Sequence, residues 1–463
     1  MRFLDKLLRR RASAPTAPEP APLPYPRRSL QDHLSPAGRK RILALDGGGV
    51  RGIMSIALLE RIEDILRARH GNHPDFRLSH YYDMIGGTST GSIIAAALAA
   101  KQMKASEIGE IYRTLAPKVF KKPFLRIGIF FSVFDGERLL AELRNVFGDM
   151  TLGAPEIDTG FSLVAKRADT NSTWVMHNHP DGIYFRDPPD RSYLGNRHYP
   201  LVNIIRASTA APWYFAPERI EILKGQQYGL FVDGGTTPHN NPSFQMLMLA
   251  GLRNYNFGWS LHHENLLMTS IGTGSMGAPG EIDRLSRRRN WERTRDGLTS
   301  MISSSEDFIE FLMQWISYCP DPKEIDSEIG DLRDDFLTDY PLATYCRYQS
   351  ELSQAFLERE LGLSLTAAEL KTLREMTDPQ GMEHAYEVGQ RMAELFIRES
   401  HFPAAFDLTA EDEPAHPGEA SPPVMHRAST GALPEAPETA FAAPEAPLEM
   451  LSTLSRRNGR RSL

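Results

Sequence analysis

The sequence is poor in cysteine, in excess basic charge and in long apolar runs. Cys319 and Cys346 are too few for a disulfide scaffold in 463 residues and suit a reducing compartment. The 52 Lys and Arg residues are outnumbered by 59 Asp and Glu residues, whereas general nucleic-acid binders carry a basic excess. The apolar run at residues 93–100 stops at Lys101, far short of the ~20 residues that span a bilayer. We therefore expect no transmembrane segment and no nucleic-acid partner.

The first eleven residues, MRFLDKLLRRR, are too short and too polar for a secretory signal sequence, so we expect a cytoplasmic protein. As a helix, this segment would place apolar side chains on one face and mainly basic ones on the other. A frayed, solvated terminus is the simpler interpretation because the helix would be very short. Peripheral contact with a membrane is the alternative.

Composition predicts a division of the chain into four parts. Residues 1–37 combine the basic start with a proline-rich linker, and residues 404–463 form a tail rich in Ala, Pro and Glu that we expect to be disordered. The folded body then spans residues 38–403, and 41% hydrophobic residues are enough for a sizeable core. We expect a catalytic core over 38–275 and a mainly helical extension over 276–403 packed on it.

Short β-like runs alternate with helical patterns along this body. Helical spacing occurs at residues 53–66 and 92–100, and helices are also expected within 300–318 and 365–400. The strand candidates are residues 41–45, 82–85, 162–166, 201–205, 229–232 and 266–271. This alternation predicts an α/β fold, with a mostly parallel central sheet covered by helices on both faces.

The sharpest chemical signal is Gly87-Thr88-Ser89-Thr90-Gly91, between the strand candidate 82–85 and the helix 92–100. A G-x-S-x-G sequence in a strand–turn–helix context is typical of a nucleophile elbow, where a tight turn presents the serine hydroxyl at a helix N-terminus. The alternative is an ordinary Gly/Ser-rich turn.

A second signal, Asp46-Gly47-Gly48-Gly49-Val50-Arg51-Gly52, directly follows the first strand candidate. Glycine backbone at a helix N-terminus offers uncovered N–H donors for a phosphate or a developing oxyanion. The run also fits the dinucleotide-binding pattern G-x-G-x-x-G, but the next strand does not end in the acidic residue that this pattern requires.

A third signal is Asp233-Gly234-Gly235, again directly after an apolar strand candidate. An aspartate at the carboxyl end of a strand lies on the edge where open α/β sheets assemble their sites. There it can deprotonate a serine, or it can simply stabilise a turn.

Together with Asn240-Asn241-Pro242, these three motifs resemble the patatin-like phospholipases. The stretches at residues 206–215 and 270–274 look like that family too, so the resemblance covers roughly residues 40–275. It implies a metal-free, cofactor-free serine hydrolase that cleaves acyl esters of phospholipids or lysophospholipids. By this resemblance Ser89 is the nucleophile, Asp233 its base, and the amides of Gly47, Gly48 and Gly49 the oxyanion hole. Supporting motif positions are Arg51, which holds the loop or meets a substrate phosphate, and Gly52, Gly87, Gly91, Gly234 and Gly235.

Histidines offer the main alternative chemistry. His239, His262 and His263 follow Asp233, as a Ser-Asp-His triad of an ordinary α/β-hydrolase would require. The resemblance instead favours a Ser-Asp dyad. His177 and His179 could suggest a metal pair, but no third ligand stands at zinc-like spacing, and a polar loop is the better interpretation.

Other functions stay open at this point. The same dyad would suit an acyltransferase or thioesterase, and the long tails would suit an effector silent until a partner or signal molecule binds. The basic and aromatic stretch at residues 118–134 is typical of a headgroup interface, or of a lid packed on the core. Substrate headgroup and oligomeric state cannot be predicted from these patterns.

Overall fold

The computed structural model describes residues 23, 25, 27–121, 133–276 and 290–408, with backbone alone for residues 290–296, 298 and 299. The expected N-terminal amphipathic segment, most of the proline-rich linker, residues 122–132 of the aromatic stretch and most of the C-terminal tail lie outside the described residues. No described helix has the length and hydropathy needed to cross a membrane.

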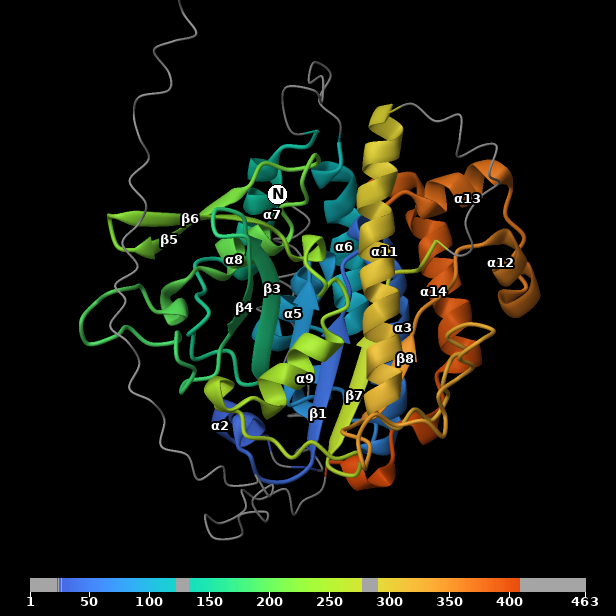
Figure 1. The fold of residues 1–463 in the computed structure, drawn as a ribbon, viewed down its shortest axis with the longest axis horizontal. Helices are drawn as coiled ribbons and strands as arrows, with labels where there is room; N and C mark the ends of the chain where they lie inside the picture. Colours follow the sequence, from blue (N-terminus) through green and yellow to red (C-terminus); the bar gives the residue numbers. More distant parts are fainter. Residues whose placement is uncertain (1–22, 24, 26, 122–132, 277–289, 409–463) are drawn as a thin grey trace, which may run out of the picture. The chain divides into compact units, whose positions relative to one another are not determined.

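An eight-stranded sheet organises the described residues (Figure 1). Its order is β5-β6-β3-β2-β1-β7-β8, and β4 pairs with β3 off this path. The central strands β3, β2, β1, β7 and β8 are mutually parallel, whereas β4, β5 and β6 pair antiparallel. The strands are β1 Lys40–Leu45, β2 Met84–Thr88, β3 Gly160–Arg167, β4 Ser172–His177, β5 Glu218–Leu223, β6 Gln227–Asp233, β7 Leu266–Ile271 and β8 Thr344–Tyr348.

Alternate residues of β1 enter two different cores. Leu43 and Leu45 belong to one buried cluster, while Ile42 and Ala44 belong to the other. Such a strand is apolar on both faces, which explains why it reads as a continuous apolar run in the sequence. The predicted mostly parallel sheet with helices on both faces is confirmed.

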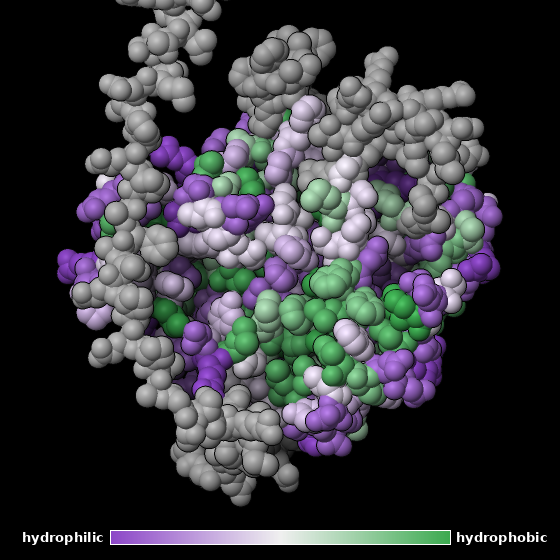
Figure 2. All heavy atoms as spheres, in the orientation of Figure 1, coloured by the Kyte–Doolittle hydropathy of each residue, from purple (hydrophilic) through white to green (hydrophobic). Residues whose placement is uncertain are grey.

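Helices of the larger cluster cover one face of the sheet. These are α3 (Gly52–Arg69), α5 (Thr90–Lys101), α6 (Ala105–Val119), α7 (Gly136–Phe147), α8 (Leu201–Ser208), α12 (Gln354–Leu361), α13 (Ala367–Arg374) and α14 (Met382–Phe396). The opposite face is covered by α9 (Ser243–Gly251) and α11 (Asn290–Ile316). On this second side, Figure 2 shows an area of apolar side chains among charged ones, and α11 exposes Met301 and Phe308.

The strand predicted at residues 201–205 is wrong, because these residues begin helix α8. Leu201, Val202, Ile204 and Ile205 are buried while Asn203 is only partly buried. That order of apolar positions fits the 3.6-residue period of a helix rather than the alternation of a strand.

The folded region extends beyond both expected limits. Tyr25 is buried, and the short helix α2 (Leu30–Leu34) packs on the sheet, so the linker ends before residue 37. At the other end Phe406 and Leu408 are buried, so the tail begins after residue 404. Besides its helices, the C-terminal part supplies the strand β8 to the central sheet.

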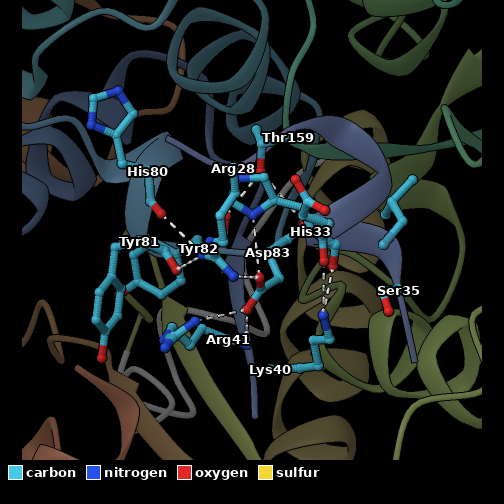
Figure 3. Close-up of polar contacts among 12 residues, drawn as sticks. Arg28, His33, Ser35, Lys40, Arg41, His80, Tyr81, Tyr82, Asp83 and Thr159 are labelled. Atoms are coloured by element: carbon cyan, nitrogen blue, oxygen red, sulfur yellow. Dashed lines mark hydrogen bonds and ion pairs between the residues drawn. The ribbon is translucent and has the colours of Figure 1, made fainter. Parts of the chain in front are cut away.

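Asp83, just before β2, binds both Arg28 and Arg41 (Figure 3), and through Arg41 it connects these two ends. Its carboxylate accepts from Arg28 Nη1 at 2.5 Å and from the Arg41 backbone N–H at 2.8 Å. Arg41 Nε in turn donates to the carbonyl of Phe406 at 2.7 Å. Burial raises the pKa of Asp83, but the charges of Arg28 and Lys40 outweigh it and hold that pKa far below its usual range. A buried carboxylate therefore fastens residues from both ends of the folded region.

Candidate active site

Ser89 lies in a sharp turn between β2 and α5, at the carboxyl end of the central parallel strands. Its φ of 53° and ψ of -124° are strained for a residue with a side chain. Small neighbours are needed there, since a Cβ on Gly87 would lie 2.2 Å from the carbonyl carbon of Gly91, and one on Gly91 2.2 Å from the Leu45 oxygen. The turn therefore has the geometry of a nucleophile elbow.

Ser208 on α8 fixes this turn from outside. The Ser89 backbone N–H donates to Ser208 Oγ at 2.9 Å, and Ser208 Oγ donates to the Val164 carbonyl of β3 at 2.6 Å. Through this relay, the strained turn is tied to two neighbouring elements of the core. Ser208 belongs to the stretch 206–215 but was not singled out individually in the sequence, since a lone serine in an apolar helix carries no distinctive signal.

Asp233, the last residue of β6, faces the serine directly. Ser89 Oγ donates to Asp233 Oδ2 at 2.6 Å, while Asp233 Oδ1 accepts the Gly235 N–H at 2.7 Å. Burial raises the pKa of this carboxyl to about 6, although both hydrogen bonds oppose the change. A carboxylate held this way is a stronger base than an exposed aspartate and is still ionised at neutral pH.

The glycines after Asp233 allow neighbouring chain segments to approach closely. A Cβ on Gly234 would lie 2.3 Å from the Val164 carbonyl oxygen, and one on Gly235 would lie 2.6 Å from Asn240 Oδ1. The contacts at Gly234 and Gly235 both lie next to the Asp233 carboxylate. Glycine is required here by space rather than by an unusual φ.

The glycine loop 47–49 crosses the site beside Ser89, but its three amides differ. The Gly47 N–H already donates to the Asn240 carbonyl at 3.2 Å. Within the residues that the structure covers, no acceptor is found for the N–H of Gly48 or Gly49. Gly49 has a φ of 59°, and a Cβ there would lie 2.0 Å from the Met376 carbonyl oxygen. The N–H groups of Gly48 and Gly49 are therefore available to a ligand, whereas that of Gly47 already has an acceptor.

Arg51 and Gly52 follow this loop at the start of α3. Arg51 is buried and lines the cavity at the site, and its Nε and Nη1 have no hydrogen-bond partner among the residues described. Burial lowers the pKa of the guanidinium to about 10, so it is charged at neutral pH. A Cβ on Gly52 would lie 2.7 Å from Thr90 Oγ1, which brings α3 close to the elbow.

A cavity of about 510 Å³ opens onto Ser89 and Asp233. Its lining includes apolar side chains from α5, α6, α7 and the loop after α8, namely Ile93, Leu115, Val119, Phe120, Leu139 and Phe215. The lining also includes the polar residues Arg51, Asn240 and Glu306. The described ends of the aromatic stretch 118–134 pack inward, since Val119 lines the cavity and Phe134 is buried against Tyr214.

None of the three rival histidines is hydrogen-bonded to Ser89 or Asp233. His239 Nδ1 is buried with no hydrogen-bond partner in the described part of the chain, and burial lowers the pKa of this imidazole. His262 and His263 stand before β7, at the edge of the sheet opposite the carboxyl end of β2. The structure thus brings Ser89 and Asp233 together without a histidine between them.

His177 and His179 are buried rather than part of a polar loop. The His179 ring lies 4.5 Å from that of Phe257, and His177 packs on the same phenylalanine at 5.5 Å. In residues 27–121, 133–276 and 290–408, no group of three or more His, Cys, Asp or Glu side chains is arranged to hold a metal ion.

Two charged side chains at the site come from the expected helical extension and were not singled out in the sequence. Arg347 on β8 donates to both oxygens of Asp46, at 2.9 and 2.5 Å, and the pair is buried. Glu306 on α11 lines the cavity and accepts a hydrogen bond from Asn240 Nδ2. Neither residue stands in a recognisable motif, so only the tertiary structure places them here.

Comparison with known proteins covers the part of the chain that carries the three motifs. Residues 43–247 match the family model described as patatin-like phospholipase. The chain is 29% identical over 235 residues to a cGAMP-activated phospholipase of Escherichia coli (strain TW11681), covering 51% of this chain and 62% of that protein. A cGAMP-activated phospholipase of Vibrio cholerae is 32% identical over 211 residues (44% and 56%), and Patatin-16 of Solanum tuberosum is 27% identical over 248 residues (50% and 60%). The chain thus spans less than two thirds of each of these relatives.

Proposed function

Because residues 43–247 match the patatin-like phospholipase family model, we propose that this protein is a serine hydrolase that cleaves acyl esters of phospholipids or lysophospholipids through a Ser89–Asp233 dyad. The observation that carries this proposal is the hydrogen bond of 2.6 Å from Ser89 Oγ to Asp233 Oδ2. An activated hydroxyl beside unoccupied backbone donors is the arrangement that acyl transfer needs.

The geometry supports a two-step reaction. Ser89 Oγ attacks the ester carbonyl carbon while Asp233 Oδ2 takes the hydroxyl proton, and the N–H groups of Gly48 and Gly49 stabilise the oxyanion. When the tetrahedral intermediate collapses, Asp233 returns the proton to the leaving alcohol, and an acyl-serine remains. Water, deprotonated by the same carboxylate, then releases the fatty acid and restores Ser89.

The mixed lining of the cavity suits a lipid ester. The apolar side chains of α5, α6 and α7 suit the acyl chain, whose transfer out of water is favourable. The polar side chains suit the leaving group, and Arg51, whose Nε and Nη1 have no hydrogen-bond partner among the residues described, offers its charge to the phosphate. Trp213 lines the cavity and is half exposed, so the same mouth offers an aromatic contact to a lipid surface.

The decisive experiment measures turnover of a soluble short-chain ester by single variants, each checked for folding by circular dichroism. Ser89→Ala and Asp233→Asn should each reduce turnover to background, since one lacks the nucleophile and the other the proton acceptor. His239→Ala, His262→Ala and His263→Ala should retain most activity. Near-background turnover in one folded histidine variant would replace the dyad with a triad. Full activity in Ser89→Ala would remove the serine as nucleophile.

A second candidate concerns control of the activity rather than its chemistry. Two relatives are named as cGAMP-activated phospholipases, so activation of this chain by a cyclic dinucleotide is a testable extension. It predicts weak hydrolysis of phospholipid vesicles by the purified protein and strong hydrolysis after cGAMP is added. Equal activity with and without the nucleotide would exclude gating by cGAMP.

A further inference from the structure

We propose that Glu306, on α11 and outside the family-matched residues, is a positioning residue for the oxyanion hole. This proposal rests on the proposed serine hydrolase function, because it assigns the Gly48 and Gly49 amides as donors to the oxyanion. Nothing in the G-x-S-x-G or glycine-loop motifs requires an acid from this helix. With Glu306 in this role, the C-terminal part of the chain contributes a residue that supports catalysis.

The contact between Glu306 and the glycine loop runs through Asn240. Asn240 Nδ2 donates to Glu306 Oε1, and the same amide nitrogen lies 3.3 Å from the Gly47 carbonyl oxygen. The backbone carbonyl of Asn240 accepts the Gly47 N–H at 3.2 Å. Asn240 thus binds both polar groups of Gly47, whose carbonyl also accepts from Thr273 Oγ1 at 2.8 Å, and the contact with Glu306 orients the Asn240 carboxamide.

The glycine loop depends on such outside contacts because it has no side chains of its own to anchor it. Gly47 immediately precedes the two glycines whose N–H groups are unoccupied. A Cβ on Gly47 would lie 2.3 Å from Asn240 Oδ1 and 3.0 Å from Ser89 Cβ, so the loop, the amide and the nucleophile are in close contact. Because the Asn240 amide packs directly against Gly47, we expect its rotation to shift the loop and with it the donors relative to Ser89.

Helix α11 approaches this loop with two acids one turn apart. Glu306 and Glu310 stand four residues apart and share a helix face. Glu310 Oε2 accepts from Tyr345 OH at 3.0 Å and lies 3.5 Å from Arg347 Nε. Arg347 in turn holds Asp46, the residue before Gly47. The next turn of the same helix thus supports the loop by a second route, through Arg347 and Asp46.

The charge environment explains why an acid can occupy this position. Burial and the neighbouring Asp46 carboxylate raise the pKa of Glu306 to about 7, while the cations of Arg347 and Arg51 oppose that change. The acceptor oxygen facing Asn240 is present in both protonation states. A glutamine at this position would keep that acceptor, whereas alanine or methionine would not.

The test compares Glu306→Ala, Glu306→Met and Glu306→Gln with wild type on a soluble ester. Asp307→Asn, an acid-to-amide change at the next and exposed position of α11, is the matched control. Misplacing a reacting group by about 1 Å can cost ~10²-fold. We therefore expect kcat to fall ~10–100-fold in Ala and Met with KM nearly unchanged, and to stay within about threefold of wild type in Gln.

A transition-state mimic separates positioning from general damage to the structure. A trifluoromethyl ketone analogue of the ester adds to Ser89 and places an oxyanion in the hole, whereas the fatty alcohol only occupies the cavity. Affinity for the ketone should fall by the same factor as kcat in Glu306→Ala and Glu306→Met. Affinity for the alcohol should not change. Methionine fills the volume of the glutamate, so agreement between the two variants excludes a simple cavity effect.

The other possible results contradict either the role of Glu306 or the proposed function. Wild-type kcat in a folded Glu306→Ala or Glu306→Met, with Ser89→Ala inactive, would refute positioning by Glu306 and leave the dyad intact. Equal losses for the ketone and the alcohol, or a failure of glutamine to restore kcat, would make the role of Glu306 purely structural. Activity in Ser89→Ala would instead refute the proposed function itself.

Discussion

The pH dependence of ester turnover should report the ionisation of the Asp233 base. Burial raises the pKa of this carboxyl from 3.8 to about 6. With a pKa of 6, the ionised fraction grows from about 9% at pH 5 to about 91% at pH 7, so kcat/KM should rise about tenfold over that range. A carboxyl at its ordinary value would give a change of less than about 10%.

The assay is steady-state hydrolysis of a soluble, uncharged ester between pH 4.5 and 8, at constant ionic strength. Glu306, with a pKa raised to about 7, is the other acid at the site that titrates in this range, so the same profile is recorded for Glu306→Gln. The rise near pH 6 should persist in that variant, because it belongs to Asp233. A flat profile from pH 5 to 7 in both proteins would refute Asp233 as the base, provided that circular dichroism shows them folded.

Three other substitutions test the glycine loop, the Asp83 cluster and the cost of burying Asp233. Gly49→Ala should lower turnover by ~10²-fold, because a Cβ there is strained at a φ of 59° and would clash with the Met376 carbonyl. Gly38→Ala is the control for backbone strain alone, since Gly38 has a φ of 74° but open space around the added Cβ. Asp83→Asn should lower the free energy of unfolding at pH 7 by about 3–5 kcal/mol, measured in urea, because Arg28 loses its buried ionic partner; an unchanged midpoint would contradict this. Asp233→Asn should raise the free energy of unfolding at pH 7 by at most about 3 kcal/mol. The reason is that the raised pKa of Asp233 in the folded state makes the wild-type protein lose stability as the pH rises from about 4 to 6. If the variant and the wild type had the same stability at pH 4 and also at pH 7, this prediction would be wrong.

The sequence predicted the elements whose pattern arises from local backbone requirements. The strand candidates at residues 41–45 and 266–271 are continuous apolar runs because both of their faces are buried, and they correspond to β1 and β7. The glycines around Ser89 are visible for a similar reason, since a tight turn tolerates no side chain there. Such constraints act within a few residues, so they produce patterns that can be recognised in the sequence.

What the sequence did not predict depends on contacts between distant segments. Residues 201–205 were assigned to a strand because a short apolar run alone does not separate a strand from a buried helix. β8 contains Arg347 among apolar residues, and only its pairing with β7 brings that charge to Asp46. Glu306 looks like any acid on a helix until α11 is placed beside Asn240. The occupied Gly47 amide likewise depends on the distant Asn240 carbonyl.

The cluster around Asp83 indicates that the folded region can be circularly permuted. Arg28 and Phe406 are both tied to the same pair of side chains, Asp83 and Arg41, so the two ends of the folded region lie close together. A short linker from residue 408 back to residue 23, which keeps the buried Tyr25, should therefore bridge them without disturbing the core. New ends can be opened in the exposed turn at residues 224–226, between β5 and β6. The catalytic residues would keep their positions in such a circular permutant, because the sheet that carries them does not depend on where the chain starts.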